Sequence, residues 1–326
     1  MRRFATLLER LALTPSRTGK MRLLEGYFSD APDPDRGIGL AAITRDLDLA
    51  GVKPAMLRAL AAERIDEELF ALSYDYVGDL AETIALIWEP RALSEPPPLG
   101  EVVRRLQAAG KTEAPGLIRD LLDGMEAGER YALLKLATGG LRVGVSARLA
   151  KQALADWGRV DVTEIEELWH GLAPPYEDLF AWLEGRAAKP AQAGHARFRP
   201  VMLATALDEA SLDALDPAEY LAEWKWDGIR VQAAAEQGTR RLYTRTGDDI
   251  SRAFPDLVDA MAFEGVLDGE LLVGDPQGGT APFAELQKRL NRKTVGKAMM
   301  ARLPAFLRAY DLLQEGGEDL RPLPFA

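Results

Sequence analysis

The sequence predicts a chain of two parts, an all-helical first part and an α+β second part built on an antiparallel sheet. Before about residue 190, apolar residues recur at helical spacing and alternating strand patterns are absent. After about residue 200 the pattern becomes strand-rich, with a turn dipeptide at Asp227-Gly228. With 326 residues, the chain is long enough for roughly two domains of ordinary size.

The composition excludes several classes of protein. The chain is 47% hydrophobic and 28% charged, as expected for a globular protein. No apolar run is long enough to span a membrane, and Glu9 and Arg10 interrupt the only stretch that resembles a signal peptide. The absence of cysteine excludes disulfides and thiolate zinc sites, and it fits a reducing cytoplasm. The histidines, His170 and His195, lack metal-ligand spacing and are expected on the surface or in a linker.

The first part is expected to form one helix after another over residues 1–185. Phe4, Leu7, Leu8 and Leu11 recur at helical spacing, and Pro54 stands where a helix can begin. Glycines or prolines separate most of the later apolar-periodic segments, and no fixed-period repeat is found. Residues 186–199 contain few large apolar side chains and are expected to be a linker.

The second part, residues 200–326, is expected to combine antiparallel strands with two short helices. Gly265–Val273 is interpreted as a hairpin or a strand pair, and Phe254–Met261 and Pro282–Leu290 as helices. The single strands are expected at Tyr220–Trp226, Ile229–Ala235, Arg241–Arg245 and Ala305–Leu313.

Lys225 is the candidate nucleophile, in the string Glu223-Trp224-Lys225-Trp226-Asp227-Gly228-Ile229-Arg230. A lysine amine attacks electrophiles once it is deprotonated, although an isolated lysine is usually a surface residue. On a strand, Trp224 and Trp226 would point away from Lys225 into the sheet packing and anchor the core.

Four further side chains are candidates for binding a nucleotide. Arg230 and Arg245 offer donors suited to phosphate or ribose oxygens, or they form ordinary surface salt bridges. Glu270 offers a carboxylate to a ribose hydroxyl or to Mg²⁺. Tyr310 offers a flat face to a purine, or is simply a buried aromatic residue.

The net charge of −11 argues against nucleic-acid binding through bulk charge. Five cations nevertheless fall within ten residues without an acid among them: Lys288, Arg289, Arg292, Lys293 and Lys297. They form either a solvated face or a contact to a phosphate backbone.

The ordered set of Lys225 with Asp227-Gly228, Thr244–Gly247, Asp268–Leu271 and Ala309–Leu313 resembles the covalent nucleotidyltransferases: DNA ligases, RNA ligases and capping enzymes. The resemblance covers about residues 200–326. It implies that Lys225 attacks the α-phosphate of ATP to form lysyl-AMP. The roles it implies for the others are adenine contact for Glu223, ribose and phosphate binding for Arg230 and Arg245, ribose or metal binding for Glu270, base stacking for Tyr310, and a later step for Asp227.

The first part narrows the resemblance to bacterial-type ATP-dependent DNA ligases. Residues 140–146 are similar to the "LRIGV" segment of their helical DNA-binding domain, and Asp79–Thr83 to its "GDLAET" segment. Gly140 and Gly144 would let backbone N–H groups approach phosphates, with Arg142 and the helix N-terminus near Ser146 beside them. Pro200–Ala204 resembles the P-x-L-A entry to the adenylation domain.

The resemblance implies a cytoplasmic enzyme that seals nicks in duplex DNA during repair, replication or recombination, with ATP and Mg²⁺. AMP passes from Lys225 to the 5′-phosphate, and the 3′-hydroxyl then attacks. The family's second glutamate motif, its K-x-K lysines and its OB-domain motif are not found after Leu313. We therefore expect an incomplete adenylation domain, no OB domain, and weak or no self-adenylation by these 326 residues. A monomer without membrane association is expected.

Two alternatives remain open. An RNA ligase or capping-type enzyme would prefer a nicked RNA duplex or accept GTP over ATP. A non-catalytic nick-binding module would bind equally well after Lys225→Ala and would never form an AMP adduct.

Overall fold

The computed structural model describes residues 1–47, 49, 52–110, 112–169, 171–190, 196–204, 206–277, 279–290, 292 and 295–324. The chain divides into two compact units, Met1–Ile165 with Leu172–Ala191 and Glu166–Gly171 with Gln192–Ala326. The predicted helical region and the following antiparallel sheet are confirmed. The limits predicted for the linker stay predictions. His170, His195 and Lys293 lie outside the described residues.

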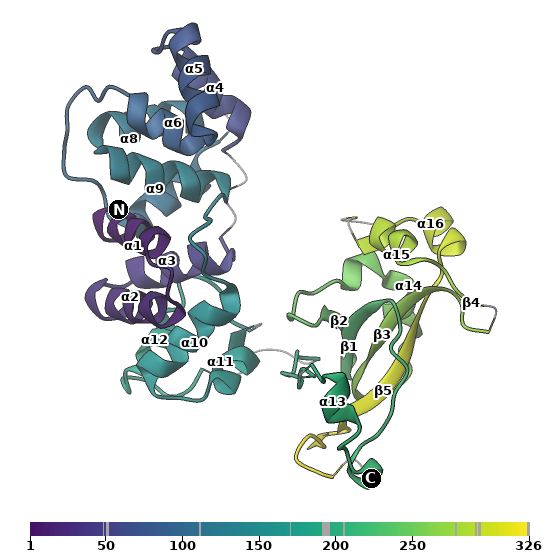
Figure 1. Ribbon diagram of the computed structural model, residues 1–326. Coiled ribbons are helices and arrows are strands. Elements are labelled where there is room, and N and C mark those ends of the chain that lie inside the picture. The colour runs from purple at the N-terminus through teal and green to yellow at the C-terminus, as the bar shows by residue number, and fades with distance from the viewer. Residues whose placement is uncertain are drawn as a thin grey trace. The chain divides into compact units, whose positions relative to one another are not determined.

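Helices make up the first region, coloured purple to teal in Figure 1. None of the described helices is both long and apolar enough to cross a bilayer. The helices are α1 Arg2–Leu13, α2 Arg17–Asp30, α3 Asp35–Thr44, α4 Pro54–Ala62, α5 Glu67–Val77, α6 Leu80–Ile87, α7 Leu99–Ala108, α8 Ala114–Gly124, α9 Ala127–Thr138, α10 Ala147–Gly158, α11 Val162–Trp169 and α12 Glu177–Leu183.

The helical core follows from the predicted apolar stripes. All four stripe residues of α1 are buried, and α1 packs against α2 and α9. Helix α9 also packs against α6, so it lies between α1 and α6 (Figure 1). Phe28 of α2 contacts the rings of Trp157 and Phe180, with centroids 6.2 and 5.7 Å away. Burial of such aromatic side chains is a main source of stability, and here it joins α2 to α10 and α12.

The second region is an antiparallel sheet with the strand order β2-β1-β3-β5-β6, and β4 pairs with β3. Its strands are β1 Ile229–Glu236, β2 Thr239–Thr244, β3 Gly265–Asp275, β4 Gly279–Thr280, β5 Ala305–Glu315 and β6 Glu318–Asp319. Its helices are α13 Glu209–Leu212, the 3₁₀ turns η1 Pro217–Glu219 and η2 Ser251–Ala253, α14 Pro255–Ala260, α15 Phe283–Leu290 and α16 Lys297–Arg302.

The central strand β3 has two different faces, because successive side chains of a strand point in opposite directions. Leu271 and Val273 belong to the apolar core that lies on the side of α14 and α15. Val266 points the other way, into a smaller apolar cluster with Phe198 and Tyr243. Asp268 and Glu270 share the face of Val266, so this face carries acidic groups at the middle of the sheet.

The strand predicted over Tyr220–Trp226 is wrong, because residues 220–226 form neither strand nor helix. Trp224 is therefore not a core anchor: it is 85% exposed. Trp226 is half-buried, and the guanidinium carbon of Arg308 lies 4.2 Å from its ring centre. Gly265–Val273 is not a hairpin but part of the single strand β3.

Arg289, one of the five clustered cations, is a core residue and not a surface cation. Its side chain is fully buried, and it bonds both oxygens of Asp256, at 2.5 and 2.9 Å. It also donates to the backbone carbonyls of Ala253 and Leu303. Burial raises the pKa of Asp256, but the hydrogen bonds from Arg289 outweigh burial and lower it. Of the rest, Arg292 and Lys297 are exposed, and Lys288 pairs with Glu285.

We expect Arg289→Ala to lower the free energy of unfolding by about 3 kcal/mol, because it leaves a partly buried carboxylate and two carbonyls without their donor. Arg292→Ala, three residues away on the surface, is the matched control and should change stability by less than about 0.5 kcal/mol. Urea unfolding of both variants measures the difference. Equal stabilities would show that Arg289 does not hold this core together.

Candidate functional site

The acidic face of β3 faces an arginine on the neighbouring strand. Arg230 of β1 and Glu270 of β3 are directly paired residues of the ladder. Arg230 Nη2 lies 2.6 Å from Asp268 Oδ2, and its Nε lies 3.2 Å from both Asp268 oxygens. The hydrogen bond with Asp268 raises the pKa of Arg230, so the guanidinium keeps its charge. Asp268 is only 2% exposed, and a buried carboxylate needs such a partner.

A cavity of about 580 Å³ lies beside this ion pair. Arg230 Nη1 donates to the backbone oxygen of Met202 at 2.9 Å, which ties one wall of the cavity to the sheet. The volume is in the range of small-molecule sites. The lining residues are Pro200, Val201, Met202, Arg230, Asp268, Tyr310, Asp311, Leu312, Leu313, Leu320, Arg321, Leu323 and Pro324.

Residues 197–202 lead to this wall of the cavity, and side chains of the sheet hold them in place. Arg199 N donates to Gln232 Oε1 at 2.7 Å, and Gln232 Nε2 donates back to Arg199 O. Arg197 N and Arg199 Nη2 both bond the carboxylate of Glu236, at 3.1 and 2.9 Å. Because Gln232 is buried, its two bonds to one backbone position set where the segment crosses the sheet.

Tyr310 lies at an irregularity in β5. Gly269 pairs with Ala309 and Asp268 pairs with Asp311, so Tyr310 is an extra residue on its strand. Such a bulge re-aims a side chain. The ring of Tyr310 lines the cavity, and its centre is 5.9 Å from the guanidinium carbon of Arg230. Burial, reinforced by the charge of Asp268, raises the pKa of Tyr310, so the phenol stays neutral.

Lys225 does not lie on a strand, but its charge acts on Glu270. Burial raises the pKa of Glu270, and the Gly228 N–H and the charges of Lys225 and Arg230 partly oppose this effect. The Glu270 carboxylate therefore lies near the Gly228 backbone and under the electrostatic influence of both cations. Lys225 itself is exposed. The nucleophile candidate and the carboxylate candidate are thus neighbours.

Gly228 allows this closeness. A Cβ atom at this position would lie 2.4 Å from Leu271 O and 2.8 Å from Glu270 Cγ. Contacts this short with backbone do not occur, so only glycine lets the Asp227-Gly228 bend lie directly against β3.

The remaining predicted residues are exposed near this end of the sheet. Arg245 follows Thr244, which pairs with Val231, so it stands in the turn beside the position of Arg230. Glu223 adds to the negative charge that raises the pKa of Tyr310. Asp227 occupies the bend before β1. Their chemical roles stay predictions.

Asp268 is a site residue that sequence reasoning missed. The string Asp268-Gly269-Glu270 drew attention to its glutamate only. A signal was present, because Asp268 and Glu270 are two residues apart on one strand and so share a face. Gly269, between these two residues, lies very close to the backbone of β5, because a Cβ atom at this position would be 2.5 Å from Arg308 O.

The helical region holds its own candidate segment, residues 140–146. Gly144 has φ +65°, and Lys20 Nζ bonds the carbonyls of Val143 and Gly144 at 2.6 and 3.2 Å. Ser146 Oγ accepts the Leu149 N–H at 3.2 Å and caps α10, while Arg142 is exposed. One expectation is corrected here. The Gly140 N–H already donates to Lys135 O, so it is not free for a phosphate.

The Asp79–Thr83 segment connects to residues 140–146 through Lys135. Lys135 Nζ bonds Asp79 Oδ2, and Asp79 also caps α6 by accepting the Glu82 N–H at 3.0 Å. Burial raises the pKa of Asp79, but the bonds from Lys135 and Glu82 outweigh it and lower the pKa. The two predicted segments are therefore parts of one hydrogen-bonded arrangement around Lys135.

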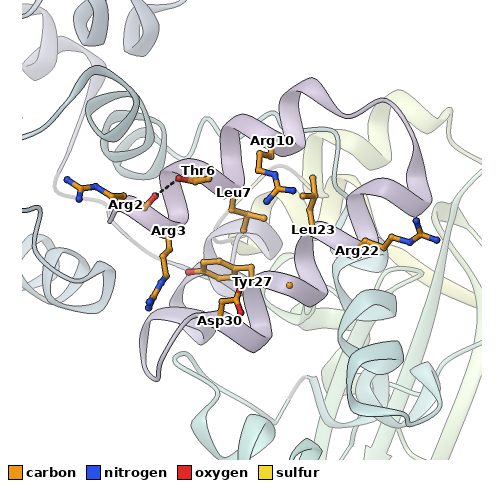
Figure 2. Close-up of a pocket in the computed structure, with 10 residues that line it drawn as sticks. Arg2, Arg3, Thr6, Leu7, Arg10, Arg22, Leu23, Tyr27 and Asp30 are labelled. Carbon is orange, nitrogen blue, oxygen red and sulfur yellow. Dashed lines mark hydrogen bonds between the residues drawn. The ribbon is translucent and has the colours of Figure 1, made fainter.

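A second cavity, of about 340 Å³, lies between α1 and α2 and was not predicted (Figure 2). Its lining includes four arginines and one acidic residue: Arg2, Arg3, Arg10, Arg22 and Asp30. Arg2 Nε bonds Glu129 at 2.9 Å. Figure 2 shows that the other three arginines point in different directions, so they do not converge on one position.

Comparison with known proteins identifies both regions. Residues 1–155 match the family described as "DNA ligase N terminus", and residues 201–326 match the family described as "ATP dependent DNA ligase domain". The chain belongs to the ATP-dependent DNA ligase family. The resemblance to these ligases is thereby confirmed.

Its relatives in the ligase family are longer than this chain. It is 29% identical to the probable DNA ligase of Koribacter versatilis (strain Ellin345), a match that covers 98% of this chain and 58% of the relative. It is 28% identical to the DNA ligase of Pyrobaculum calidifontis, covering 98% and 60%. The solved structure named Pmar-Lig_PreS3 matches with a TM-score of 0.45 and 17% identity, covering 95% and 57%.

The ligase-family site provides few groups for a metal ion. Among the described residues, no cluster of three or more His, Cys, Asp or Glu side chains is arranged to hold one. A Mg²⁺ ion that arrives with a triphosphate needs only one or two carboxylates, because phosphate and water supply the remaining oxygens. Glu270, next to Lys225 and Arg230, fits that requirement.

The raised pKa of Glu270 predicts a pH-dependent cost to stability. Above the ordinary value of 4.5, the unfolded chain releases a proton that the folded protein still holds, so the free energy of unfolding falls as pH rises. Glu270→Gln keeps the size of the side chain and removes the charge. We expect the variant to be more stable than wild type at pH 7 and equal to it near pH 4, by urea unfolding. The exposed Glu315→Gln is the control, and a destabilised Glu270→Gln protein at pH 7 contradicts the prediction.

Proposed function

We propose that this chain carries out, as part of an ATP-dependent DNA ligase, the adenylation of Lys225 and the binding of nicked duplex DNA. What supports the proposal is the proximity of Lys225 and Arg230 to Glu270, with Tyr310 on an adjoining cavity. This is the combination of nucleophile, cation, carboxylate and aromatic face that nucleotide transfer requires.

The chemistry is a displacement at phosphorus. Lys225 Nζ attacks the α-phosphorus of ATP, a nitrogen–phosphorus bond forms, and the bond to the bridging oxygen breaks. Pyrophosphate leaves with the electron pair, and the amine proton passes to solvent. Arg230, fixed by Asp268, faces the charge that develops on the phosphate oxygens. Because Asp268 holds the guanidinium in place before ATP binds, little reorganisation is needed.

The remaining residues orient the nucleotide. Glu270 accepts a hydrogen bond from a ribose hydroxyl or contributes one oxygen to Mg²⁺, which would neutralise phosphate charge. The neutral ring of Tyr310 stacks on the adenine, and Glu223 contacts the base. Arg245 adds a second cation to the phosphate site from the turn after β2.

The later steps act on DNA. The adenylyl group passes from Lys225 to the 5′-phosphate at a nick, with help from Asp227, and the 3′-hydroxyl then displaces AMP. In the helical region, Gly144, Arg142 and the N-terminus of α10 at Ser146 contact the phosphate backbone. The setting proposed for this activity is DNA repair or replication in the cytoplasm.

Lys225→Ala should abolish covalent labelling by radioactive ATP. The adduct is expected to form slowly on these 326 residues, so concentrated protein and long incubation with Mg²⁺ are used, and the labelled peptide is mapped by mass spectrometry. Label on Lys225 from ATP supports the proposal. Label that survives Lys225→Ala, or label from GTP in preference, contradicts it.

Arg142→Ala should weaken binding to nicked duplex DNA at every sequence tested and reduce the slope of log affinity against log salt by about 1, because one phosphate contact is lost. Arg104→Ala, an exposed arginine of α7, is the control and should bind as wild type does. Fluorescence anisotropy at several salt concentrations gives both quantities. An unchanged slope would remove Arg142 from the interface.

A further inference from the structure

The segment that carries Lys225 has few attachments to the sheet. Residues 221–227 lie between η1 and β1 without secondary structure. In the described part of the chain, no backbone–backbone hydrogen bond is found for these seven residues. The nearest backbone attachment is the close approach of Gly228 to β3, where a Cβ atom would lie 2.4 Å from Leu271 O. A nucleophile must nevertheless be held at a defined place, since displacement at phosphorus depends on orientation.

The side chain of Trp226, the residue after Lys225, provides another attachment. Its ring stacks on the Arg308 guanidinium of β5, with 4.2 Å between the guanidinium carbon and the ring centre. Arg308 is paired across the ladder with Glu270, so this contact lies one strand away from the Gly228 attachment. Arg308 Nη2 also donates to Pro276 O at 3.2 Å.

Hydrogen bonding explains an arginine at position 308 only in part, through the bond from Nη2 to Pro276 O. Its Nε atom is buried and lacks a hydrogen-bond partner among the described residues. An unsatisfied buried donor is unfavourable, so another interaction must favour the side chain. Two aromatic rings provide such an interaction, Trp226 at 4.2 Å and, farther away, Phe306 at 5.8 Å. The closer contact with Trp226 suits a guanidinium, which is flat and weakly hydrated, whereas a lysine ammonium is compact and strongly hydrated.

We propose that Arg308 is a positioning residue for Lys225 and acts through Trp226. Trp226 directly follows Lys225 in the chain. By holding the Trp226 ring against β5, Arg308 therefore restricts where the backbone of Lys225 can lie. The anchoring itself is independent of the proposed function, and only its effect on adenylation rests on that function.

The first test is a double-mutant cycle on the rate of lysyl-AMP formation by the full chain. Arg308→Ala and Trp226→Ala should each slow the reaction about tenfold, and the double variant should be no slower than either one. Arg308→Lys should restore little, and Trp226→Phe, which keeps an aromatic face, should restore most of the rate. Arg241→Ala, an arginine of β2 that pairs with Asp249 at 3.4 Å, is the control. Additive losses, or full rescue by lysine, would overturn the proposal.

The second test needs no nucleotide, so it stands even if no adduct forms and the proposed function fails. Trypsin cleavage after Lys225, followed by mass spectrometry, should be several-fold faster in Arg308→Ala and Trp226→Ala than in wild type and Arg241→Ala. Cleavage after the buried Arg289 reports general loosening of the fold and should stay unchanged. Unchanged cleavage after Lys225, or equal acceleration at both positions, would overturn the anchoring role.

Discussion

The ion pair between Arg230 and Asp268 is the interaction on which the site depends. Asp268 is buried in the middle of the sheet, where an unpaired carboxylate would be very unfavourable, so Arg230 must stay beside it. The same guanidinium holds the backbone of Met202 and faces the ring of Tyr310. The wall of the cavity, its aromatic residue and its cation are therefore positioned together, and loss of either charge would disturb all three.

The helical region uses buried lysines in a comparable way. Lys20 holds the carbonyls of residues 143–144, and Lys135 joins Asp79 to the end of α9 near Gly140. Both ammonium groups face inward and bond backbone or carboxylate oxygens. The segment proposed to meet DNA is thus shaped by cations that do not themselves lie on the surface, which suits a chain with a net charge of −11.

The spacing of apolar residues correctly predicted those helices and strands that bury one face in the core. Residues 1–13 show this, because the stripe Phe4, Leu7, Leu8 and Leu11 records one buried helical face. The aromatic residues around Lys225 suggested a strand in the same way. A strand forms only when it pairs with another strand, and the sequence of the segment alone does not show whether a partner strand is present. Arg289 was misjudged for a similar reason: its counter-charge, Asp256, is 33 residues away. Whether a charged or aromatic residue is buried depends on partners far away in the sequence, and the spacing of residues does not reveal those partners.

Between Ala309 and Asp311, strand β5 contains one residue that has no partner on β3. The register of the two strands shifts again between Leu312 and Gln314. Each extra residue reverses which side chains of the following stretch face the core. The length of this strand is consequently under a stricter constraint than its composition. An apolar residue there can be exchanged for another of similar size, whereas deletion or insertion of one residue would turn the rest of the strand over and carry Asp311 and Leu313 to the wrong faces.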